Sequence, residues 1–223
     1  MRKINFKANI PWNTILVISV IFVAFILPVL PQSCHEFVFR IVYSIIYFAA
    51  IFSLEKRNNY QFSLFGATIF TEWFSILLHL PVLLYLSKGL NVIFFLIIVI
   101  SLVRQIAIAK QVTSKIIFES IAVYLLVGLI YSIFIGLIFQ YDPTAFSGLP
   151  LNTYHSSQGI NISSSLYYVY VTLASLGYGD IVPLKPYTRS FATFIAISGQ
   201  FYTTIIVAML VGKYASQRQD KID

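Results

Sequence analysis

Apolar residues occur along this chain in long runs separated by short polar segments. Six runs have about the 20 residues that a helix needs to cross the hydrocarbon core of a bilayer. They cover roughly residues 12–30, 37–54, 62–86, 90–109, 116–140 and 187–211. A shorter apolar run before residue 175 is a candidate for a segment that enters the membrane and returns on the same side. The pattern predicts an all-α polytopic membrane protein, with a four-helix module over residues 1–115 and a second module over residues 116–223.

The composition agrees with a membrane environment. Hydrophobic residues make up 58% of the chain and charged residues 10%, against about 25% charged in soluble domains. The net charge of +7 is spread over short loops and forms no continuous basic face. The charge therefore gives no reason to expect nucleic-acid binding.

The distribution of basic residues predicts the orientation, because Lys and Arg are retained on the cytoplasmic side. With a cytoplasmic N-terminus, the inside set is Arg2, Lys3, Lys7, Lys56, Arg57, Arg104, Lys110, Lys115, Lys213, Arg218 and Lys221. The outside set is Arg40, Lys88, Lys185 and Arg189. We therefore expect an integral protein of the plasma (inner) membrane, with both termini cytoplasmic and the segment from Tyr141 to Ser163 outside.

The N-terminus has a second interpretation. Arg2, Lys3 and Lys7 precede the apolar run Ile15–Leu27, as in a secretory signal peptide with a small-residue site near Ser33. The run is long for a signal peptide, so we favour a first membrane span. The single cysteine, Cys34, has no intrachain disulfide partner, and we interpret it as a small residue in an outer loop.

The segment Thr172–Asp180 reads T-L-A-S-L-G-Y-G-D and is the most informative part of the chain. Its two glycines flank an aromatic residue, which permits backbone conformations that turn successive carbonyls toward one axis. The segment resembles the selectivity filter of potassium channels. The resemblance covers roughly residues 116–212, and for the first four runs it is one of topology only.

The resemblance implies that K⁺ is bound by Ser175, Leu176, Gly177, Tyr178 and Gly179. Ser175 and Leu176 stand where the family usually has Thr and Val. Serine keeps the hydroxyl, and leucine contributes only its carbonyl. Because four such loops surround one pore in the family, the resemblance also implies a homotetramer.

A short helix should precede the filter. Ser163, Ser164 and Ser165 are candidate N-caps for a helix that runs to Ala174. Its C-terminus would point into the membrane, and the helix dipole would favour a cation there. Val171 stands where some family members carry a glutamate, so the corresponding carboxylate pair is missing here.

Aromatic residues near the filter have two interpretations. Tyr167 and Tyr168 stand where many potassium channels have an aromatic pair, and we expect Tyr168 to support the filter with Tyr178 or Asp180 as hydroxyl partner. The alternative is that they belong to the aromatic belt at the membrane interface. The resemblance assigns to Asp180 a bracing and cation-attracting role at the outer mouth.

The last run should form the inner helix, starting at Pro186. Gly199 has two equally weighted interpretations, a hinge or a point of close helix packing. The family's spacing places Gln200, Thr203, Val207 and Val211 on the pore side. Polar residues there suit a hydrated cavity, and the valines suit a constriction that closes by dewetting.

The first four runs lack a voltage-sensing arginine series. The fourth has Arg104 alone, and Lys110 and Lys115 are better interpreted as interfacial anchors. In the third run, Glu72 and His79 lie seven residues apart on one helical face. We favour a structural role in which Glu72 pairs with Arg104 or with a polar side chain to hold the helix packing, and proton sensing by Glu72 and His79 is the alternative.

The functional hypothesis is a non-enzymatic channel that conducts K⁺ passively and is not strongly voltage gated. His35, His79 and His155 are isolated from other metal ligands or catalytic partners, and no phosphate-binding glycine loop occurs. Two alternatives are a potassium-uptake transporter and a receptor or accessory subunit with a vestigial pore. The gating stimulus, including a separate regulatory subunit, stays open.

Overall fold

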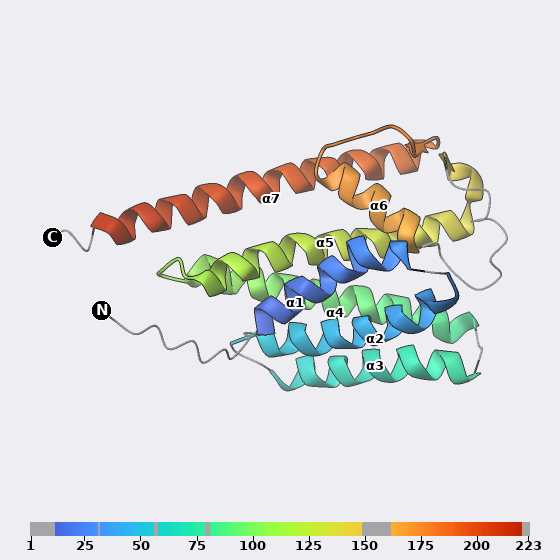
Figure 1. Ribbon diagram of the computed structural model, residues 1–223, viewed down its shortest axis with the longest axis horizontal. Coiled ribbons are helices and arrows are strands. Elements are labelled where there is room, and N and C mark those ends of the chain that lie inside the picture. Colours follow the sequence, from blue (N-terminus) through green and yellow to red (C-terminus); the bar gives the residue numbers. More distant parts are fainter. Residues whose placement is uncertain (1–11, 31, 56–57, 79–80, 149–161, 220–223) are drawn as a thin grey trace.

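The computed structural model describes residues 12–30, 32–55, 58–78, 81–148 and 162–219 (Figure 1). Long helices dominate the described chain, and one two-stranded ribbon accompanies them. The elements are α1 (Trp12–Ile21), the π-helical η1 (Phe22–Ile26), the 3-10 turn η2 (Leu27–Val29), α2 (Gln32–Ser53), α3 (Asn59–Leu78), α4 (Pro81–Ile108), α5 (Ser114–Tyr141), the 3-10 turn η3 (Pro143–Ala145), β1 (Phe146–Ser147), α6 (Ile162–Leu173), β2 (Val182–Pro183) and α7 (Pro186–Gln219).

Four of the described helical segments are long and apolar enough to cross a membrane. They are Trp12–Val29, Tyr85–Ile108, Ser114–Tyr141 and Pro186–Gln217. The apolar part of α2, Phe37–Ser53, is shorter. The prediction of an all-α polytopic membrane protein is confirmed, and the count of six spans stays a prediction.

The boundary between the third and fourth predicted spans is wrong. Leu78 ends α3, and Pro81 begins α4 rather than lying inside the preceding helix. Proline suits the first turn of a helix, because its missing N–H has no acceptor there in any case. The polar stretch 87–89, which separates two predicted spans, lies within α4. It is tolerated there because Ser87 is buried and the Lys88 Nζ donates to Gln140 Oε1 at 3.5 Å.

Helix α5 connects the two parts of the molecule. It packs against α1 and α4 on one side and against α6 on the other, as Figure 1 shows. Leu126 and Leu129, both fully buried, belong to a core that extends from α1 to α7. Because residues 109–113 alone connect α4 to α5, the four-helix module lies, through α1 and α4, on the α5 of its own chain.

Of the two predicted partners of Glu72, Arg104 is wrong and a polar side chain is confirmed. Glu72 Oε1 lies 3.7 Å from Arg40 Nη1, and the Asn91 side-chain amide donates to Glu72 Oε2 at 3.1 Å. Asn91 and Arg104 are thirteen residues apart on α4, a rise of about 20 Å, so Arg104 cannot reach the same level. Arg104 is exposed and makes no ion pair within the described chain. His79 lies outside the described residues, so the proposed proton-sensing pair remains a prediction.

A buried carboxylate at the other end of the bundle joins three helices. Glu119 of α5 is 0% exposed, and its Oε1 accepts from Asn13 of α1 at 2.9 Å and from Gln105 of α4 at 2.5 Å. Lys115 lies 3.7 Å from Glu119 and forms an ion pair with Glu55. The sequence analysis did not single out Glu119, although an ionisable residue in an apolar run was an available signal.

Candidate ion pathway

The two ends of the loop that contains the G-Y-G sequence are tied together. Strand β1 pairs antiparallel with β2, with Phe146 opposite Pro183. The Leu184 N–H extends this contact by donating to the Ala145 carbonyl at 2.8 Å. The loop therefore begins and ends at the same end of the molecule, as a re-entrant segment requires (Figure 1).

Gly148 lets the two ends approach closely. Its φ is +82°, and a Cβ added there would lie 1.7 Å from the Asp180 carbonyl oxygen. Any other residue would meet both a backbone clash and a strained conformation. The sequence analysis missed Gly148, because only the fold shows which distant backbone lies against it.

Helix α6 lies between α5 and α7 (Figure 1). The Tyr170 hydroxyl donates to the Leu125 carbonyl of α5 at 2.8 Å, and its ring occupies the space beside Gly128. On the opposite side, a Cβ at Gly199 of α7 would lie 2.2 Å from the Leu173 carbonyl oxygen. Of the two interpretations of Gly199, this contact supports close helix packing.

The helix starts at Ile162, so Ser163, Ser164 and Ser165 lie within its first turn rather than ahead of it. Its other end forms a Schellman motif. The Leu176 N–H donates to the Val171 carbonyl at 2.9 Å, and the Ser175 N–H donates to the Thr172 carbonyl at 3.0 Å. Ser175 takes the left-handed position of this motif with φ 56°. The first residue of the predicted filter is thus also the C-terminal cap of the preceding helix.

Backbone handedness alternates along the rest of the filter. Ser175, Gly177 and Gly179 have φ values of 56°, 56° and 76°, whereas φ is not positive at Leu176 and Tyr178. In an extended strand, successive carbonyls point to opposite sides. Positive φ at every second residue departs from this extended pattern and allows successive carbonyls to turn to one side. Such a row of backbone oxygens can replace the water around a cation.

The filter is bordered by polar groups of α7. Gln200 Nε2 donates to the Ser175 hydroxyl oxygen at 2.8 Å, at the start of the predicted filter. Gln200, Thr203, Val207 and Val211, which the resemblance places on the pore side, are all exposed in the single chain. The Thr203 hydroxyl donates to the carbonyls of Gly199 and Gln200, at 3.1 and 3.0 Å.

Asp180 is braced by a different tyrosine from the one expected. The Tyr167 hydroxyl donates to Asp180 Oδ2 at 2.6 Å. This hydrogen bond holds the pKa of Asp180 below its usual value. Tyr168 is buried, and its ring meets Phe146 edge-on with the centroids 5.1 Å apart. The expected bond of Tyr168 to Asp180 is wrong, because successive helical residues point about 100° apart and it is Tyr167 that reaches Asp180.

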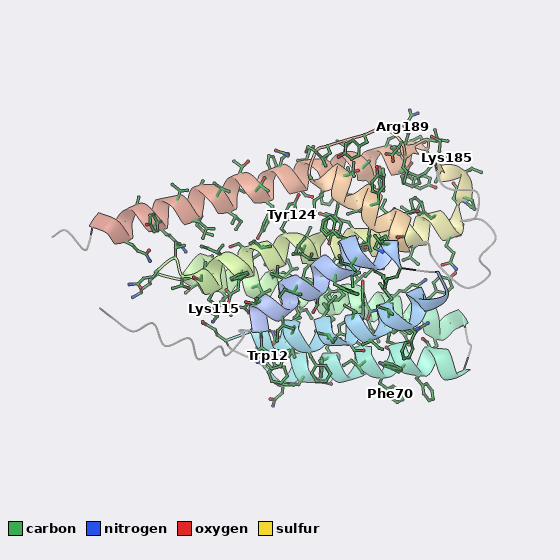
Figure 2. All side chains as sticks on the ribbon, viewed as in Figure 1. Trp12, Phe70, Lys115, Tyr124, Lys185 and Arg189 are labelled. Carbon is green, nitrogen blue, oxygen red and sulfur yellow. The ribbon has the colours of Figure 1, made fainter. Side chains whose placement is uncertain are left out.

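Charged residues gather at the two ends of the molecule. Figure 2 shows Lys185 and Arg189 near the loop and Lys115 toward the other end. At the loop end, Asp142 accepts from the Thr144 hydroxyl and from the Tyr187 hydroxyl, at 2.6 and 2.8 Å. These bonds lower the pKa of Asp142.

Comparison with known families identifies the class of this segment. Residues 120–215 match a family model described as "Ion channel". The match includes most of α5, the whole segment Thr172–Asp180 and most of α7, and it indicates an ion channel. It also points to a non-enzymatic protein. Searches of curated proteins and of solved structures found no match.

Proposed function

We propose that the protein is a potassium-selective channel that conducts K⁺ passively as a homotetramer in the plasma membrane, with both termini cytoplasmic. The observation that carries the proposal is the alternating handedness at Ser175, Gly177 and Gly179. A filter for a small cation needs several uncharged oxygens at fixed spacing, and this backbone supplies them.

The proposed ion path follows from the chemistry along the loop. The Ser175 hydroxyl oxygen and the carbonyls of Leu176, Gly177, Tyr178 and Gly179 take the place of the hydration shell. The C-terminal end of α6 contributes a partial negative charge beneath them. Gln200 and Thr203 keep the space below polar, so a rehydrated ion can leave the filter.

The single chain leaves these groups uncovered, which supports assembly around an axis. Leu176 and Tyr178 are 58% and 67% exposed, and most residues of the span Pro186–Gln217 are not buried. Irregular backbone is tolerated at membrane depth only where it lines an aqueous path or is buried in protein. A cavity of about 730 Å³ beside the filter, bordered by Phe25 and Tyr170, offers room for a neighbouring subunit. A closed ring of four chains would cover the exposed groups of α7 and enclose an aqueous path along the predicted filter.

The proposal is tested by reconstitution in liposomes that hold a K⁺ gradient. We expect K⁺ flux that Ba²⁺ blocks, and a bi-ionic reversal potential that favours K⁺ over Na⁺ by at least about a hundredfold. Gly177→Ala should abolish conduction, because φ 56° is strained for a residue with a Cβ. The matched control is Gly66→Ala on α3, where an added Cβ meets nothing within 4 Å. Equal permeability to K⁺ and Na⁺ would disprove selectivity. A parent protein that forms a tetramer but gives no K⁺ flux would favour a vestigial pore.

A further inference from the structure

Lys213, near the C-terminal end of α7, bonds to the C-terminal end of α4. Its Nζ donates to the carbonyls of Ile106, Ala107 and Ala109, each at 2.8 Å. The partners lie more than 100 positions away along the chain. In Figure 1, the turn between α4 and α5 reaches toward this part of α7.

The chemistry of this contact is specific. The last carbonyls of a helix have no partner within it, and they form the negative end of the helix dipole. An ammonium group has three donors, so one lysine can satisfy three such carbonyls at once. A neutral side chain of similar length offers fewer donors and no charge.

The contact lies on the face of α7 that points away from the expected pore. Tyr202, Ile206 and Met209 share this face with Lys213, and they pack against the core around α5. The Tyr202 hydroxyl also donates to the Ser120 carbonyl at 2.7 Å. Around the helix axis, Lys213 lies roughly 120° from Val207 and roughly 160° from Val211. The ammonium therefore holds the inner end of α7 outward, toward α4.

We propose that Lys213 is a positioning residue for the gate: it fastens the inner end of α7 to α4 and thereby keeps the Val207–Val211 constriction wide. In the proposed tetramer, the four copies of Val207 approach the pore axis, and so do the four copies of Val211, only after the three hydrogen bonds of Lys213 break. This inference rests on the proposed channel function. It makes α4 the element whose displacement is transmitted to the pore, even though α4 lacks a sensor arginine series.

The test is the open probability of single channels in planar bilayers, with variants at Lys213. We expect Lys213→Gln to lower the open probability by at least about fivefold, because neutral hydrogen bonds are weaker than charge-assisted ones. Unitary conductance and reversal potential should stay unchanged, since the filter is untouched. Lys213→Arg keeps a cationic donor and should retain most of the open probability. Lys110→Gln removes a nearby exposed charge from the same turn and should have no effect.

A second measurement does not depend on conduction. The single native cysteine is first removed by Cys34→Ser, and a new one is introduced by Val211→Cys. The rate at which a water-soluble thiol reagent modifies the new cysteine is then measured with and without Lys213→Gln. We expect slower modification without the lysine, because the constriction narrows. The inference would be overturned by any of three results. These are an open probability of Lys213→Gln that is unchanged or higher, an equal loss of open probability in Lys213→Arg, or a thiol reactivity of Val211→Cys that Lys213→Gln leaves unchanged. A parent protein without K⁺-selective current would instead contradict the proposed function.

Discussion

At the scale of single residues, Gly148 is where a small change should disturb the pore loop most. Gly148→Ala should destabilise the assembled protein by at least about 2 kcal/mol, because the methyl group meets the Asp180 carbonyl and φ is positive. Thermal unfolding in detergent measures the effect. Gly66→Ala is the control, and it should be neutral or slightly stabilising, since it lies in a helix with open space around it. Equal stability of the two variants would show that β1 and β2 do not hold the loop in this way.

The hydrogen bond between Tyr167 and Asp180 predicts a titration shift. The Tyr167 hydroxyl lowers the pKa of Asp180 from its ordinary value of 3.8. This contribution to stability is present above that ordinary value and is lost as the pH falls through the lowered, folded-state pKa. Tyr167→Phe should therefore raise the pKa of Asp180 and leave that of Asp142 unchanged.

NMR titration of isotope-labelled aspartate carboxyl carbons measures both pKa values. Tyr187→Phe is the converse control: it should raise the pKa of Asp142, which loses one of its donors, and leave Asp180 unaffected. If Tyr167→Phe moves neither pKa, the brace on the outer mouth is absent in solution.

The sequence predicts some of these residues better than others for a physical reason. The residues of the predicted filter form one contiguous segment, and its two glycines permit backbone conformations that other residues rarely adopt. Gly148, Tyr167 and Lys213 depend on partners that lie far away in the sequence or on a particular face of a helix. The expected charged partner of Glu72 failed for the same reason, because Arg40 reaches Glu72 from a neighbouring helix.

At the scale of elements, the contact between α6 and α7 distinguishes packing from hinge at Gly199. Gly199→Ala should destabilise the protein by about 1–3 kcal/mol, since a Cβ would lie 2.2 Å from the Leu173 carbonyl oxygen. Gly212→Ala, on the same helix with nothing within 4 Å, is the matched control. Detergent-induced unfolding compares them. A Gly199→Ala protein of normal stability but altered gating would favour the hinge instead.

Helix existence could be predicted from hydrophobic runs, but some helix boundaries could not. The predicted break near Lys88 failed because a polar stretch inside a membrane helix can be satisfied by a neighbouring helix, here by Gln140 of α5. The start of α4 at Pro81 is explained by the fit of proline to a first helical turn. Both features depend on the surroundings of the residue rather than on local hydropathy.

At the scale of the whole molecule, α1 and α4 are bonded to α5 and α7 of their own chain, toward both ends of the bundle. Lys88 bonds to Gln140 of α5 near the filter end. Toward the other end, Glu119 gathers Asn13 and Gln105, and Lys213 reaches α4. A module attached in this way can transmit lateral pressure, lipid contacts or the binding of another subunit to the pore.

The charge content of α4 predicts weak dependence of conduction on voltage. Within Pro81–Ile108 the charged residues are Lys88 and Arg104, one toward each end of the helix. Voltage sensors move three to four charges per subunit, and each charge contributes about 2.3 kcal/mol per 100 mV. Residues near the ends of a span cross little of the membrane field. We therefore expect the open probability to change by less than about tenfold over 200 mV in planar bilayers.

Arg104→Gln should leave the voltage dependence unchanged. A steep activation curve that saturates within tens of millivolts would contradict this prediction, because it would require charges that α4 does not carry.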